Sequence, residues 1–171
     1  MRDDNEDYPA LVIANDMLGG GFLSSRLATR IRQEEGLSYS VGSQVAAPSI
    51  DDSAVFLTFA IFAPENADKV VTAFRDEVRK ALEDGFTEEE FEAARRGFLD
   101  RQQNGRSQDR AIASMLNNNL FTGRTMAFTA AQEQAIEELT LDEVNAALRK
   151  YISLDAISIF RGGDFANKLN Q

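Results

Sequence analysis

The 171-residue sequence contains no cysteine and no histidine. These two absences exclude disulfides, thiol redox chemistry, histidine-based catalytic triads and nearly every known type of structural or catalytic zinc site. A calcium or magnesium site built from carboxylates alone stays open, although the sequence has no Asp-x-Asp-x-Asp-Gly loop. We therefore do not expect this chain to be a zinc enzyme by itself.

Positive charge and long hydrophobic runs are also scarce. The chain has 18 basic against 28 acidic residues and a net charge of −10, which disfavours nucleic acid and anionic membranes as partners. No window approaches the roughly 20 apolar residues of a membrane span. Met1–Asp7 is too charged for a signal peptide, so any targeting segment is expected to lie outside this chain.

The composition is otherwise that of a globular protein, with 43% hydrophobic and 27% charged residues. Helical spacing predicts a first helix from Tyr8 to Leu18 that ends at Gly19–Gly21. A second helix, capped by Ser24 or Ser25, is predicted to end at Gly36. We expect residues 1–171 to form one domain, because the length allows about two-thirds of the unfolded surface to be buried.

Three segments have strand patterns. Alternation of apolar and polar residues predicts a strand at Leu37–Val41. The run Ala54–Ala63, which is apolar on both faces, predicts a central strand that pairs with it in antiparallel fashion. A late strand at Ala156–Phe160 is expected to pair with the earlier two. The resulting fold class is α+β, with helices packed on one face of a mostly antiparallel sheet.

The middle of the chain is predicted to be helical. Two Thr-x-x-Glu capping boxes mark helix starts, one at Thr87 and Glu90 and the other at Thr140 and Glu143. Between them lie two further predicted helices, separated by a turn at residues 123–125, the second of which spans Ala130–Leu139.

Two candidate binding features have a simpler interpretation. The glycine run of Leu18–Leu27 lacks the spacing of a phosphate-binding loop, which favours a loop that ends a helix. An arginine-rich stretch is interleaved with acidic residues at helical spacing, which favours a solvated, salt-bridged face over a basic patch. The arginines are Arg95, Arg96, Arg101, Arg106 and Arg110, and the acidic neighbours are Glu88, Glu89, Glu92, Asp100 and Asp109.

Arg32 and Tyr39 form the third candidate. Arg32 ends a predicted helix, and Tyr39 follows seven residues later in a predicted strand. Each has a structural alternative. Tyr39 is two residues from both Leu37 and Val41, would share their face of a regular strand, and could be a core tyrosine. Arg32 could complement the negative end of its helix.

The stretch Met17–Gly42 (MLGGGFLSSRLATRIRQEEGLSYSVG) resembles the C-terminal half of insulinase/pitrilysin-type zinc peptidases, the inverzincins. In that signature a glycine-rich turn and Ser-Arg-Leu precede an arginine, a Gly-Leu pair and a tyrosine. The similarity covers nearly the whole chain. It continues loosely through Phe62-Ala63-Pro64, Gly85-Phe86-Thr87-Glu88-Glu89-Glu90, Leu139-Thr140-Leu141-Asp142-Glu143-Val144 and Gly163-Asp164.

The resemblance implies a division of labour between two halves. In that family an N-terminal half carries the H-x-x-E-H motif and the zinc, and the C-terminal half closes over it. The implied function is that of a substrate-binding, active-site-completing domain of a zinc metalloendopeptidase, inert without the zinc-bearing half. Arg32 and Tyr39 would then contact the bound peptide and stabilise charge on its carbonyl oxygen.

Further expectations come with the family. Its domains begin with a β-strand, which Met1–Asp7 is too short and too charged to supply, so we expect an excised C-terminal domain that lacks its first strand. The helical middle, Asp109–Thr125, resembles long bacterial members, which implies a periplasmic location. The alternative function is a non-catalytic scaffold or assembly subunit of the same family.

Overall fold

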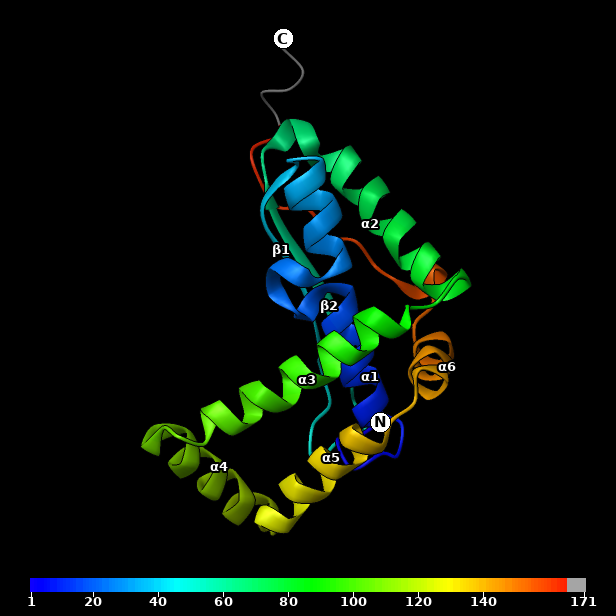
Figure 1. Cartoon of the computed structure of the whole chain (residues 1–171). Coiled ribbons are helices and arrows are strands. Elements are labelled where there is room, and N and C mark those ends of the chain that lie inside the picture. Colours follow the sequence, from blue (N-terminus) through cyan, green and yellow to red (C-terminus); the bar gives the residue numbers. More distant parts are fainter. Residues whose placement is uncertain (166–171) are drawn as a thin grey trace.

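The computed structural model describes residues 1–165 and has an α+β architecture (Figure 1). Helices dominate, and two of them contain π-helical turns. In chain order the elements are α1 (Tyr8–Asn15), η1 (Asp16–Gly20), η2 (Phe22–Ser24), η3 (Ala28–Glu34), β1 (Ser38–Ala46), β2 (Val55–Phe62), η4 (Pro64–Asn66), α2 (Ala67–Glu83), α3 (Glu88–Gly105), α4 (Asp109–Thr122), α5 (Met126–Glu138), α6 (Leu141–Tyr151) and η5 (Leu154–Ala156).

The sheet has one face covered by helices. Strands β1 and β2 pair in antiparallel fashion, with Val41 opposite Ala60 and Val45 opposite Phe56. Side chains of this face meet α1, η1, η3 and α2 in a single core, as expected for an α+β layer. Fully buried core side chains include Ile13, Leu18, Leu27, Ile31, Val78, Phe91 and Val144.

Both predicted capping boxes are present. The Thr87 hydroxyl accepts a hydrogen bond from the Glu90 backbone N–H, and the Glu90 carboxylate accepts one from the Thr87 backbone N–H. Thr140 and Glu143 repeat this arrangement at the start of α6. Each box satisfies donors that the first helical turn would otherwise leave unpaired.

Two predictions about helix starts were right only in part. Ser25 lies at the N-cap position, because its backbone is extended and its carbonyl accepts the first helical hydrogen bond from the Thr29 N–H. The hydroxyls of Ser24 and Ser25, however, donate to the carbonyls of Gly21 and Phe22 and so hold the preceding loop. The helix α5 also begins earlier than Ala130, because the Thr125 hydroxyl accepts from the Ala127 N–H and starts it at Met126.

The late strand was predicted wrongly. Residues 157–161 pair with no strand in the described part of the chain, and β2 is paired with β1 alone there, so β2 is not the expected central strand. The two segments instead line one groove of about 350 Å³, together with Val70 and Phe74 of α2. Alternation identifies an extended segment, but it does not determine which neighbour that segment meets.

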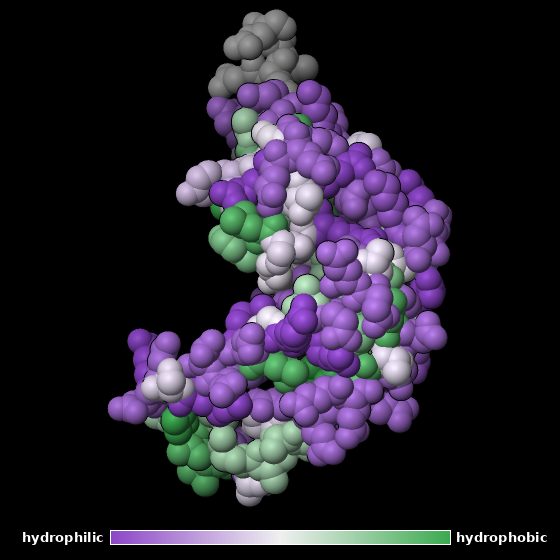
Figure 2. Space-filling view, in the orientation of Figure 1, coloured by the Kyte–Doolittle hydropathy of each residue, from purple (hydrophilic) through white to green (hydrophobic). Residues whose placement is uncertain are grey.

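An arm of helices extends from this core. The helix α3 runs away from the sheet, α4 lies at the far end, and α5 returns toward α1 and α6; the surface is hollowed between this arm and the sheet lobe (Figures 1 and 2). Leu116, Leu120 and Phe121 of α4 are exposed at the end of the arm. No helix within residues 1–165 is long and apolar enough to cross a membrane.

Candidate functional site

A β-bulge places Tyr39 on the surface. Ser38 pairs with Phe62 and Ser40 pairs with Ile61, so Tyr39 is an extra residue between consecutive pairs. Bulges of this kind redirect a side chain out of the normal alternation. Leu37 and Val41 are buried, whereas 80% of Tyr39 is exposed. The alternative of a core tyrosine is therefore wrong.

Arg32 lies in the last turn of η3, before the chain reverses at Gly36. Gly36 has φ +60°, a left-handed conformation that glycine adopts at little cost, and this turn leads directly into β1. Arg32 is exposed. Among residues 1–165, the side chains of Arg32 and Tyr39 make no hydrogen bond or ion pair, either with each other or with a third group.

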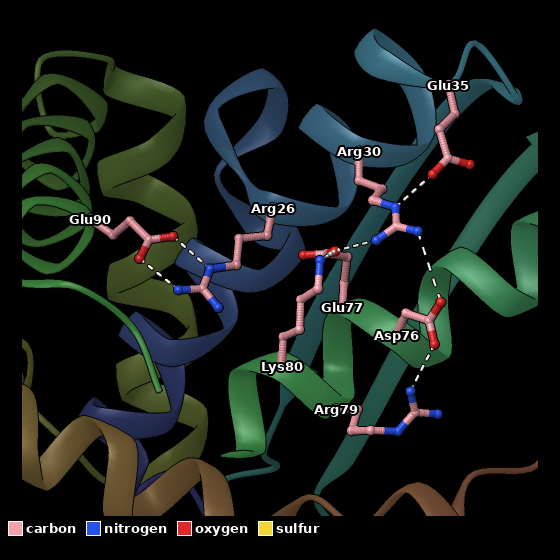
Figure 3. Close-up of polar contacts among 8 residues, drawn as sticks. All are labelled: Arg26, Arg30, Glu35, Asp76, Glu77, Arg79, Lys80 and Glu90. Carbon is pink, nitrogen blue, oxygen red and sulfur yellow. Dashed lines mark hydrogen bonds and ion pairs between the residues drawn. The ribbon is translucent and has the colours of Figure 1, made fainter. Parts of the chain in front are cut away.

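The helix that carries Arg32 is fastened to α2 by a network of ion pairs (Figure 3). Arg30 donates from Nε to Glu35 at 2.6 Å and from Nη1 to Glu77 at 3.0 Å. The Glu77 side chain, only 9% exposed, also accepts from Lys80 at 3.0 Å. The hydrogen bond that Arg30 donates to Glu35 is the main cause of the raised pKa of the Arg30 guanidinium. The Arg30 guanidinium is thus occupied by ion pairs within the fold, whereas the Arg32 guanidinium makes none among residues 1–165.

A second ion pair joins the same helix to the start of α3. Arg26 donates from Nε and Nη2 to the two carboxylate oxygens of Glu90, at 2.6 and 2.8 Å, and from Nη2 to the Gly85 carbonyl. Its guanidinium also lies 4.7 Å from the centre of the Phe86 ring. The hydrogen bonds to Glu90 are the main cause of the raised pKa of the Arg26 guanidinium. This pair was not predicted from the sequence, because its partners are 64 residues apart.

The uncovered face of the sheet is apolar. Val55, Leu57, Phe59 and Ile61 of β2 alternate toward this face, and each is more than half exposed. Their partners on β1 are small or polar: Ala46, Gln44, Gly42 and Ser40. Tyr39 adjoins the Ser40–Ile61 pair at the end of this stripe, which we call the open sheet face. The signal in the sequence was the run of residues 54–63, apolar apart from Thr58, which was interpreted as a buried strand instead.

The chain offers no zinc site. It has no histidine or cysteine, and the part described here has no group of three acidic side chains placed to hold a metal ion. The usual donors of a zinc site are therefore missing from this sequence, and the residues present do not fit that metal.

Only some ion pairs of the predicted salt-bridged face are formed within α3 itself. Arg95 pairs with Glu92 one turn away, as helical spacing predicts, but Arg101 pairs with Asp16 of η1. Arg106 pairs with Glu133 of α5. The arginines thus bind α3 to its neighbours and form no isolated basic patch for an anionic partner.

The family model and the related proteins that match this chain point to the same family. Residues 1–98, more than half of the chain, match the family described as the peptidase M16 inactive domain. An uncharacterized zinc protease of Mycobacterium tuberculosis is 34% identical over 84% of this chain and 32% of its own length. The probable zinc protease PqqL of Escherichia coli is 29% identical over 77% of this chain and 14% of its length. The chain thus spans about a third or less of these relatives.

One relative is named as a homolog without peptidase activity, and the solved structures described next share the fold of this chain. The non-peptidase homolog YmxG of Helicobacter pylori is 24% identical over 92% of this chain and 36% of its length. A peptidase M16 inactive domain from Pseudomonas fluorescens superposes with a TM-score of 0.77 at 23% identity, covering 91% of this chain and 36% of that one. The structure of PqqL, titled a periplasmic protease, gives 0.60 at 26% identity over 89% of this chain and 16% of that one.

Proposed function

Because this chain belongs to the peptidase M16 family and corresponds to its inactive domain, we propose that it is the substrate-binding, active-site-completing domain of a zinc metalloendopeptidase. In this proposal residues 1–171 are the C-terminal domain of a longer protein. The zinc resides in a separate half, in the same chain or in a partner chain, since the residues present here do not fit that metal.

The observation that carries the proposal is the exposure of Tyr39. A large aromatic residue is turned outward by a bulge, and its hydroxyl, like the Arg32 guanidinium, has no partner among residues 1–165. Both groups are hydrogen-bond donors. Peptide hydrolysis builds negative charge on the carbonyl oxygen, and donors placed at that oxygen stabilise the transition state. Arg32 and Tyr39 serve as these donors.

The open sheet face supports the same arrangement. Its exposed stripe, with Phe59 and Ile61 near Tyr39, is an apolar surface of the kind that marks binding sites. In the intact protein this face is turned toward the zinc-bearing half and the extended peptide between the halves. A neutral apolar wall near the reacting carbonyl also strengthens the hydrogen bonds made there, since it lowers the local dielectric constant.

The test uses the intact zinc-loaded peptidase. Tyr39→Phe removes only the hydroxyl, and Arg32→Ala removes the guanidinium; each is expected to lower kcat/KM by about 10²–10³-fold if it acts mainly in the transition state. Zinc content and Tm stay at the wild-type values. Arg75→Ala, which removes an arginine of α2 outside this site, is the matched control and keeps wild-type kinetics. Wild-type kinetics for both Tyr39→Phe and Arg32→Ala would refute the proposal.

The second candidate function is a scaffold or assembly subunit without peptidase activity. It is favoured by the similarity to YmxG, whose name describes a non-peptidase homolog. The sequence of the zinc-bearing half separates the two functions: an upstream segment or partner chain without H-x-x-E-H would favour the scaffold. The isolated chain is expected to hold no stoichiometric zinc and to cleave no peptide, and robust cleavage by it would contradict both functions.

The similarity to PqqL also suggests a cellular location for this protein. PqqL is titled a periplasmic protease, and we place this protein in the same compartment. Fractionation of cells that express the full-length protein, followed by immunoblotting of periplasmic and cytoplasmic fractions, tests this. Recovery with a cytoplasmic marker would reject it.

A further inference from the structure

The backbone of Phe22 is strained. It is the one non-glycine residue within 1–165 with a positive φ, at +54°. A side chain with a Cβ is unfavourable in this left-handed region, and the other positive φ values of the described chain fall on Gly36, Gly85 and Gly123. A glycine at position 22 would remove the strain, and the three preceding residues are already glycines.

The strain is not offset by burial of the ring. Phe22 is 75% exposed, and the adjacent Leu23 is 40% exposed. An aromatic ring that is both strained and solvated stabilises the fold very little. Strained residues of this kind cluster at functional sites, where the surrounding structure holds them in place.

The surrounding structure does hold this loop. The Phe22 carbonyl accepts from the hydroxyl of the fully buried Ser25 at 2.8 Å, and the Gly21 carbonyl accepts from the Ser24 hydroxyl at 2.8 Å. The Gly21 N–H donates to the Asp16 carbonyl at 2.7 Å. The loop therefore presents the ring in one conformation, and little entropy is lost when a ligand contacts it.

One further bond places the loop beside Arg32. The Leu23 carbonyl accepts from the Gln33 side chain at 2.5 Å, so the loop contacts the helical turn that carries Arg32. Phe22 and Leu23 thus add exposed apolar surface beside the helical turn that carries Arg32.

We propose that Phe22, supported by Leu23, forms an apolar subsite for a large hydrophobic side chain of the peptide substrate. This inference rests on the proposed function. The ring determines which residue is preferred near the scissile bond, and Arg32 and Tyr39 act on the bond itself. The strain at Phe22 is retained because glycine, the more stable residue at this position, would remove the subsite.

The experiment compares the intact zinc-loaded peptidase with its Phe22→Gly variant on peptides of one sequence in which a single phenylalanine is moved through the positions around the cleavage site. The wild type is expected to prefer phenylalanine at one position. Phe22→Gly is expected to abolish that preference, with a roughly tenfold or larger loss in kcat/KM that arises mainly in KM. Its Tm is expected to rise by about 2–4 °C, since the strain is relieved.

Two further variants complete the design. Phe22→Leu keeps an apolar side chain and should retain part of the preference, whereas Phe121→Ala removes an equally exposed ring from α4 and should change nothing. Phe22→Asn, which tolerates a positive φ, replaces Phe22→Gly if that variant fails to fold.

The kinetics of these variants distinguish a failure of the subsite from a failure of the proposed function. An unchanged preference and KM in Phe22→Gly or Phe22→Asn, with Arg32→Ala and Tyr39→Phe still impaired, would overturn the subsite alone. Wild-type kinetics in all of these variants would overturn the proposed function and the subsite together.

Discussion

Glu90 has two roles that can be measured separately. Its carboxylate completes the capping box with Thr87 and also accepts two hydrogen bonds from Arg26. Glu143 completes the matching box with Thr140 and has no arginine partner among residues 1–165. Glu143→Ala is therefore a matched control for Glu90→Ala, because both variants lose a capping carboxylate and only one loses the ion pair.

The expected magnitudes follow from these contacts. Loss of a capping interaction costs about 1 kcal/mol, which is the whole effect expected for Glu143→Ala. The Arg26–Glu90 pair is partly shielded, with side chains 19% and 31% exposed. Screening by solvent places its contribution near the low end of charged hydrogen bonds, about 1.5 kcal/mol. Glu90→Ala is therefore expected to lose about 2.5 kcal/mol, or roughly 5–10 °C in Tm.

Urea unfolding followed by circular dichroism at about pH 7 measures both variants. A double-mutant cycle with Arg26→Ala isolates the pair from the contact that Arg26 makes with Phe86, and a coupling near 1.5 kcal/mol is expected. Equal losses in Glu90→Ala and Glu143→Ala, or a coupling near zero, would refute the reasoning.

Two more predictions concern pH and packing. Burial raises the pKa of Glu90, but the hydrogen bonds from Arg26 and Thr87 together lower it by more, so the pKa in the folded state lies below the ordinary value of 4.5. The stability difference between wild type and Glu90→Ala should be constant above about pH 5 and shrink as pH falls through the folded pKa; a difference that grows on acidification would contradict this. Gly19→Ala should cost about 1–3 kcal/mol, since its Cβ would clash with the Ser43 hydroxyl and lie 2.9 Å from the backbone nitrogen of Ser43. The control is Gly105→Ala at the end of α3, whose added Cβ meets nothing within 4 Å and which should be neutral or slightly stabilising in thermal unfolding. If Gly19→Ala changes the Tm no more than Gly105→Ala does, the predicted clash with Ser43 is wrong.

Local signals in the sequence predicted local structure well. Thr87 and Thr140 cap their helices as expected, because a capping box depends on residues only three apart. The antiparallel pairing of β1 with β2 was also predicted correctly, since each strand has a clear pattern and a short connection joins them. These features need no information from distant parts of the chain.

Features set by distant contacts were not predicted. Arg26 meets Glu90 and Arg101 meets Asp16 across long stretches of sequence, and no spacing rule identifies such pairs. The bulge at Tyr39 inverts what alternation with Leu37 and Val41 indicated. Arg32 was located at its helix end as expected, yet spacing alone could not separate a helix-end cation from a ligand-binding one.

The unpaired edge of β2 affects how the isolated chain behaves in solution. Residues 55–62 (VFLTFAIF) contain no charge, proline or glycine, and within residues 1–165 one edge of this strand has no strand partner. Such edges act as templates on which identical strands of other molecules add, in the manner of amyloid growth. Colloidal stability of the chain then depends on its net charge of −10, which keeps copies apart at low salt and is screened as salt rises.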